Sequence, residues 1–248
     1  MMKRRTRIIC SLVLWAWVGA MHAQVTAVRG HVEIAGEHSK AKPSLPSTVV
    51  WLTPLPVANG TANNVPASTG ASLRLVQKNK NFEPHIMVVP VGSVVEFPNL
   101  DPYFHNVFSM FEGKRFDLGL YEAGTSRIVH FDRPGVSYIF CNIHPEMSAV
   151  VITLTTPLYA ISNSAGQLSI ANVPYGRYLL HIWSERRVAE NSDPETREIT
   201  ISEDSASLGA IRVPAATGRV LAHKDKYGRD YDKPTPENPI YHGDHENQ

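Results

Sequence analysis

The sequence is poor in cysteine, and this scarcity excludes a fold held together by disulfide bonds. Its 248 residues include two cysteines, Cys10 and Cys141. Cys10 lies in an N-terminal segment with the composition of a secretory signal peptide, in which four basic residues between positions 3 and 7 precede an apolar run at 8–20. Removal of that segment leaves Cys141 without a partner in the chain. A solitary cysteine in an oxidising compartment is expected to be buried or to bind a metal.

Long apolar segments are scarce as well. No stretch after residue 23 is long and apolar enough to cross a bilayer, and the run at 8–20 is too short to do so. We therefore expect a signal peptide at 1–23, cleaved after Ala23, and a periplasmic protein without a membrane span; a retained membrane anchor is the alternative. The mature chain then has 20 basic and 23 acidic residues, a net charge near −3. It lacks the clustered positive charge of nucleic-acid-binding proteins, so nucleic acid is not an expected partner.

Helical periodicity is also missing after the signal segment. Short runs of alternating or β-branched residues recur instead, separated by glycine, proline and asparagine, as at 28–34, 86–91 and 136–140. Many short strands at regular spacing predict an all-β chain built as a sandwich or barrel. Two stretches depart from this pattern. Residues 57–71 have the composition of a linker, and residues 214–248 form a polar tail that we expect to be extended over the body or mobile.

One group of residues has the chemistry of a metal site. Cys141, His144 and Met147 follow one another at the spacing Cys-x2-His-x2-Met between two predicted strands, and His105 begins another predicted strand upstream. Two imidazoles, a thiolate and a thioether form the ligand set that blue-copper proteins use, whereas structural zinc sites are built from cysteine and histidine. We therefore predict one copper ion per chain at these four residues. The alternative for each residue alone is ordinary packing in the core.

The region around these residues resembles the cupredoxin family. Residues 72–155 contain both halves of the family pattern, in order: Phe82-Glu83-Pro84, Val89, Gly92, Val95, Phe97, Asn99, Asp101 and His105-Asn106-Val107, then the ligand loop from Tyr138 to Met147. The short methionine spacing is similar to that of amicyanin, and the chain resembles exported proteins labelled methylamine-utilization proteins. The resemblance implies a Greek-key β-sandwich with His105, Cys141 and His144 as equatorial ligands and Met147 as the weak axial ligand. It also implies that the Asn106 side chain links the two ligand loops by hydrogen bonds.

The flanking segments resemble a second family. Residues 157–213 are similar to the carboxypeptidase-regulatory-like, or carbohydrate-binding-like, Ig-type module, with Asn172-Val173-Pro174 before a predicted strand. Residues 24–56 look like the opening strands of the same module, which implies that the cupredoxin domain is inserted into a small Ig-like β-sandwich. The alternative is that these opening strands belong to the cupredoxin sheet. A polysaccharide ligand is compatible with the module, but no clustered aromatic platform supports it.

Together these features predict an exported type 1 copper protein that transfers single electrons to or from another exported redox protein. A copper carrier or sensor, and a binding module with a vestigial copper site, are the alternatives. An enzyme is not expected, because the His-x-His motifs of multicopper oxidases are missing. The exposed edge of His144 beside Pro145 is the candidate port for electrons. His85 is interpreted as a surface hydrogen bonder, with a second metal site as the alternative, and His242 and His245 as a weak metal-binding pair.

Overall fold

The computed structural model describes residues 24–35, 47–56, 73–110, 113–185, 194–214 and 223–231. Within these ranges the regular structure is almost entirely β-strand, which confirms the predicted all-β class. No helix there is long and apolar enough to cross a membrane. The predicted signal peptide, the linker at 57–71, and His242 and His245 lie outside the described residues.

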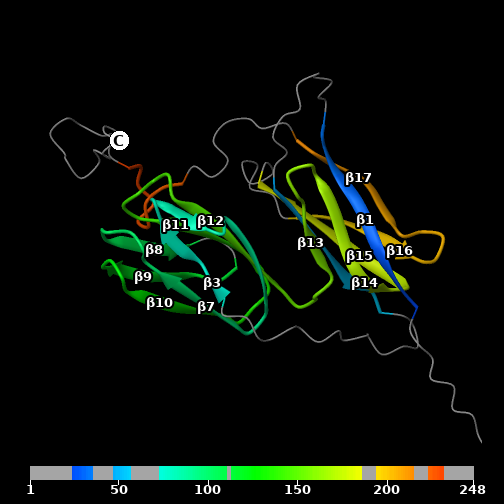
Figure 1. Ribbon diagram of the computed structural model, residues 1–248, viewed down its shortest axis with the longest axis horizontal. Helices are drawn as coiled ribbons and strands as arrows, with labels where there is room; N and C mark the ends of the chain where they lie inside the picture. Colours follow the sequence, from blue (N-terminus) through cyan, green and yellow to red (C-terminus); the bar gives the residue numbers. More distant parts are fainter. Residues whose placement is uncertain are drawn as a thin grey trace, which may run out of the picture.

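One β-sandwich is formed by the middle of the chain, and we call it the central sandwich (Figure 1). One sheet has the strand order β10-β7-β3, a second has the order β6-β12-β11-β8-β9, and a short hairpin joins β4 to β5. Side chains from both larger sheets meet in one buried core, which includes Phe97, Phe131 and Ile139. The strands are β3 (Leu73–Arg74), β4 (Val76–Lys78), β5 (Asn81–Glu83), β6 (Ile86–Pro90), β7 (Ser93–Pro98), β8 (His105–Ser109), β9 (Phe116–Tyr121), β10 (Ser126–Phe131), β11 (Gly135–Cys141) and β12 (Ser148–Leu154).

The strands before and after the central sandwich join in two further sheets, which we call the terminal sandwich. β1 pairs with β14 and β17, and β2 lies between β13 and β15, so segments far apart in the sequence share both sheets. The N-terminal strands therefore pair with C-terminal strands and not with the sheets of the central sandwich. The strands are β1 (Val25–Ile34), β2 (Thr48–Pro54), β13 (Tyr159–Ile161), β14 (Gln167–Pro174), β15 (Gly176–Ser184), β16 (Glu195–Ile201) and β17 (Ser207–Val213).

A third apolar cluster lies where the two sandwiches meet. Strand β12 contains the apolar run Ala149-Val150-Val151-Ile152, and its alternate side chains point to opposite faces. One face, with Ala149 and Val151, belongs to the core of the central sandwich. The other face packs with Val150 and Ile152 against Trp183 and Trp51 of the terminal sandwich. Apolar residues on both faces thus bury β12 from Ala149 to Leu154 and fix the strand that leaves the predicted ligand loop.

Candidate metal centre

Two neighbouring strands bring His105 and Cys141 together. His105 is the first residue of β8 and Cys141 is the last residue of β11, and these strands pair antiparallel with Cys141 opposite Val107. His144 lies on the short loop from β11 to β12. That loop is closed by backbone hydrogen bonds, because Cys141 N–H donates to the Met147 carbonyl at 3.3 Å and Met147 N–H donates to the His144 carbonyl at 3.0 Å. A loop closed in this way holds His144 over the end of β8.

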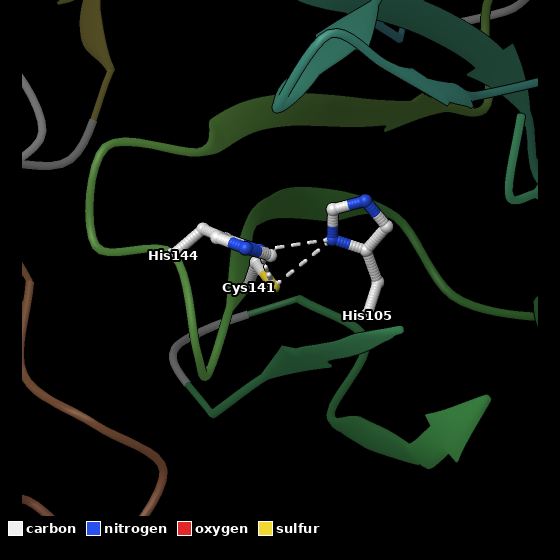
Figure 2. Close-up of side chains that lie close together, drawn as sticks. All are labelled: His105, Cys141 and His144. Carbon is white, nitrogen blue, oxygen red and sulfur yellow. Dashed lines mark hydrogen bonds between the residues drawn. The ribbon is translucent and has the colours of Figure 1, made fainter. Parts of the chain in front are cut away.

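The donor atoms of three predicted ligands converge on one point (Figure 2). The sulfur of Cys141 lies 3.5 Å from Nδ1 of His105 and 3.5 Å from Nδ1 of His144. The two Nδ1 atoms are 3.1 Å apart. Metal–nitrogen bonds of about 2.0 Å and metal–sulfur bonds of about 2.3 Å place ligand atoms at such separations when they share one ion. Among the described residues these three form the one cluster of histidine, cysteine and carboxylate groups that could hold a metal. The donor set and its spacing therefore fit a His2Cys metal site.

Met147 completes the ligand loop. Its side chain is fully buried in the core of the central sandwich, and its backbone is bonded to both Cys141 and His144. A thioether buried at this point of the loop is compatible with the weak axial position of a copper site. Its role as a ligand stays a prediction.

A buried carboxylate that was not predicted as part of the site orients His105. Asp101 is 4% exposed, and its Oδ2 lies 2.9 Å from Nε2 of His105. The same carboxylate accepts hydrogen bonds from the N–H groups of Asn79, at 2.5 Å, and Lys80, at 3.0 Å. These two residues form the tight turn between β4 and β5 and both have positive φ, 54° and 53°. An Nε2–H donated to Asp101 leaves the lone pair of His105 on Nδ1, the atom that faces Cys141.

The electrostatics of the site favour neutral imidazoles. Burial lowers the pKa of His105, although the hydrogen bond to Asp101 opposes that effect. Burial also lowers the pKa of His144 to about 4, with further lowering by the charges of His105 and Lys80. Burial raises the pKa of the Cys141 thiol, and backbone N–H groups, first that of Asn106, oppose this. Near neutral pH both imidazoles are therefore in the form that binds a metal, while the thiol must lose a proton.

The backbone and the side chain of Asn106 bond to different elements. The two ligand segments are linked by its backbone, because the Asn142 N–H donates to the Asn106 carbonyl at 2.8 Å. The Asn106 amide donates instead to Oδ1 of Asp117 on β9, at 2.8 Å. In an antiparallel pair the backbone already supplies the link between neighbouring strands, which leaves the side chain free to bond across to β9.

An aromatic ring lies beside both histidines of the site. The ring of Tyr103 lies 5.5 Å from the rings of both His105 and His144. Its neighbours on the loop before β8 include Leu100 and Phe104, which are 57% and 50% exposed. His144 itself is partly exposed, in contrast to His105 and Cys141.

His85 has ordinary hydrogen-bond partners. Its Nδ1 lies 3.0 Å from the carbonyl oxygen of Ser148, and its Nε2 bonds to the carboxylate of Glu185. Both ring nitrogens are therefore engaged without a metal. The imidazole therefore connects Ser148, the first residue of β12, to Glu185, the residue after β15 of the terminal sandwich.

No protein-family model matches the chain, and no curated protein matches it. Solved structures do match it. A purple cupredoxin from Nitrosopumilus maritimus is 22% identical with a TM-score of 0.31, and the match covers 34% of this chain and 100% of that one. A copper-containing nitrite reductase from Thermus scotoductus SA-01 is 22% identical with a TM-score of 0.33, over 43% of this chain and 28% of that one. An oxidised amicyanin variant is 20% identical with a TM-score of 0.31, over 34% of this chain and 82% of that one. At these identities the similarity concerns the fold alone.

Proposed function

We propose that this protein is an exported mononuclear type 1 copper protein that transfers single electrons. The observation that carries the proposal is the convergence of one thiol and two imidazole Nδ1 atoms within 4.8 Å of one another. The orientation of His105 by Asp101 supports it, because the carboxylate presents the correct nitrogen to the site. Bound at His105, Cys141 and His144, with Met147 as a weak fourth ligand, copper would supply one-electron redox chemistry.

The chain is suited to hold such a ligand set in one arrangement. Two of the three converging groups are on paired strands, and the third is on a loop closed by two backbone hydrogen bonds. Pro145 restricts the backbone of His144 to an extended conformation, which further limits the loop. Ligands held in this way move little when the charge of the bound metal changes, and that is the property an electron carrier needs.

The surface beside His144 is the proposed point of electron exchange. His144 is half-buried and its ring lies 5.5 Å from that of Tyr103, whose loop also carries the exposed Leu100 and Phe104. An apolar surface of this kind suits brief contact with another protein. We propose another exported redox protein as that partner. Since the described part of the chain offers one such metal cluster, the proposal is for an electron carrier and not for an enzyme with several copper sites.

A Cu(II) titration of the mature chain, residues 24–248, tests the function. We expect one copper per chain, an intense sulfur-to-copper absorption band in the visible and the EPR signature of a type 1 site. Cys141→Ser should lose the band, whereas His130→Gln, an exposed histidine on β10, should keep it. A folded chain that binds Cu(II) without the band would contradict the proposal. A site that loses copper quickly and selects Cu(I) would favour a copper carrier instead.

A further inference from the structure

A short C-terminal segment, residues 223–231, lies against the central sandwich next to the ligand loop (Figure 1). The ring of His223 stacks on Phe140, with 4.0 Å between centroids and 24° between planes. Phe140 directly precedes Cys141 in β11, so the His223 ring packs on the residue next to the predicted sulfur ligand. The polar composition of the tail predicts little burial, but this part of it has a defined place on the sandwich.

The far end of the segment bonds to a predicted ligand. The hydroxyl of Tyr231 donates to the carbonyl oxygen of Cys141 at 3.1 Å, and it lies 3.2 Å from Nδ1 of His223. The contact to Cys141 is made at the backbone on the outer side of the loop. It therefore restrains the carbonyl of the cysteine without competing for its sulfur.

Lys226 connects the segment to the ligand loop and to β9. Its N–H donates to Oδ1 of Asn142, the residue after Cys141, at 2.9 Å. Its Nζ lies 2.7 Å from Oδ2 of Asp117, whose other oxygen accepts from Asn106, the residue after His105. The Lys226 side chain is 16% exposed, so solvent screens this ion pair less than a fully exposed one. One lysine thus contacts the neighbour of Cys141 directly and reaches the neighbour of His105 through Asp117.

The segment is folded so that Lys226 is presented in this position. The carboxylate of Asp225 accepts from the N–H groups of Tyr227, at 2.9 Å, and Arg229, at 2.8 Å. The Asp225 N–H donates in turn to the Arg229 carbonyl at 2.8 Å, and Gly228 takes the positive φ that the turn requires. A turn closed by an aspartate side chain is preorganised, which reduces the entropy lost when Lys226 docks.

We propose that residues 223–231 are a structural part of the metal centre, a strap that holds the Cys141–Asn142 turn and β8 in their ligating arrangement. The proposal rests on the copper-binding function above. Tyr231 and Lys226 act as positioning residues, because each works through a ligand or its neighbour. Groups that orient metal ligands from outside typically contribute about 10- to 100-fold in metal affinity, and we expect an effect of that order here.

The test uses the full mature chain loaded with one Cu(II), with Tyr231→Phe and Lys226→Met as the variants. The readouts are the rate of copper loss to excess EDTA, the reduction potential and the EPR spectrum. We expect each variant to lose copper about tenfold faster or more, with a shifted potential. The matched controls are Tyr159→Phe, on β13 of the terminal sandwich, and Lys114→Met, outside the strap, whose side chain is 19% exposed and forms an ion pair with Asp132 at 3.0 Å. Both controls should match the unchanged protein.

The outcomes separate this proposal from the proposed function. Tyr231→Phe can be compared directly with the unchanged chain, because it keeps the ring and removes one hydroxyl. If both variants show the type 1 band with unchanged copper loss, potential and EPR spectrum, the strap proposal is wrong while the copper function stands. If the unchanged chain forms no type 1 band, the copper function is wrong and the strap proposal falls with it.

Discussion

The Nε2 atom of His105 lies 2.9 Å from Oδ2 of Asp101, and both side chains are almost completely buried. Asp101 is also the acceptor for two backbone N–H groups of the Asn79–Lys80 turn. Burial alone would raise the pKa of Asp101, but these hydrogen bonds, first that of Lys80 and then that of His105, lower it below its usual value. One ionised carboxylate therefore fixes both a turn and the imidazole that faces the predicted sulfur ligand.

Replacement of Asp101 by Asn should weaken both the fold and the metal site. An amide cannot accept from all three donors that now share the carboxylate, and one unsatisfied buried donor costs about 1–3 kcal/mol. We expect the free energy of unfolding of the apoprotein to fall by that amount, and copper affinity to fall by about 10- to 100-fold. Urea denaturation and competition with a copper chelator measure the two effects.

The control for this prediction is Asp132→Asn. Asp132 forms a 3.0 Å ion pair with Lys114, but its side chain is 59% exposed, and such pairs contribute about 0–1 kcal/mol. An Asp101→Asn variant that matched this control in both measurements would show that the carboxylate does not orient His105.

The number of protons released when copper binds should depend on pH. In the apoprotein burial raises the pKa of Cys141, so at neutral pH the sulfur carries a proton that it must lose on binding. The pKa of His144 is lowered to about 4, so its imidazole is already neutral near pH 7. We expect about one proton released per Cu(II) at neutral pH and more than one near pH 4, where His144 is partly protonated.

Calorimetry in buffers of different ionisation enthalpy measures this proton count. Cys141→Ser should lower the count at neutral pH, because a hydroxyl is a much poorer source of a proton. If the unchanged protein bound Cu(II) at neutral pH without releasing a proton, Cys141 would have to be a thiolate in the apoprotein, and the effect assigned to burial would be wrong.

Part of the candidate site could be predicted because its signal is local. Cys141, His144 and Met147 are six residues apart at most, and a loop between two predicted strands brings them near one another whatever the rest of the fold does. Strand patterns were equally informative, since apolar alternation marks the buried face of each strand. The apolar run at 149–152 in β12 predicts a buried strand. It does not indicate which partner covers the second face of that strand.

The groups that support the ligands could not be predicted in the same way. Lys226 and Asp117 are 109 residues apart, and no periodic pattern connects them. The polar composition of the tail predicts a segment that is either extended over the body or mobile, and it cannot decide between the two, because residues 223–231 are held largely by hydrogen bonds and by one stacked ring. Asp101 belonged to the motif in the sequence, four residues before His105, but its distance to Nε2 depends on the three-dimensional path of the loop.

The His85–Glu185 pair should make the stability of the protein depend on pH. The hydrogen bond to Glu185 raises the pKa of His85 above 6.5, although burial opposes it. Protonated His85 is therefore favoured in the folded state. Its contribution to stability is fully present below about pH 6.5 and is lost as pH rises through the raised pKa. We expect the melting temperature of His85→Gln to lie further below that of the unchanged protein at about pH 5.5 than at about pH 8.5.

His31→Gln is the control for that comparison. His31 also pairs with a glutamate, Glu33, but both residues are exposed on the same strand and do not connect the two sandwiches. If His85→Gln and His31→Gln gave the same difference in melting temperature at both pH values, the contact between His85 and Glu185 would not link proton binding to stability.

The interface between the sandwiches should be essential for cooperative unfolding. Trp183 is 2% exposed, packs against Val150 and Ile152 of β12, and donates its indole N–H to the hydroxyl of Tyr138 at 3.2 Å. Trp183→Ala removes this packing and should cost about 3–5 kcal/mol of stability. Because the contacts hold the sandwiches to each other, we expect a single calorimetric transition in the unchanged protein and two transitions in the variant.

Leu120→Ala separates loss of the interface from general loss of apolar surface. Leu120 is on β9 and 59% exposed, so its truncation should change stability by less than about 0.5 kcal/mol and keep one transition. A Trp183→Ala variant that still unfolded in one transition at nearly the original temperature would mean that the interface contributes little. The ligand loop would then owe its position to the central sandwich alone. If the variant instead unfolds in two steps, loss of bound copper should accompany the step of the central sandwich, since the predicted ligands all belong to it.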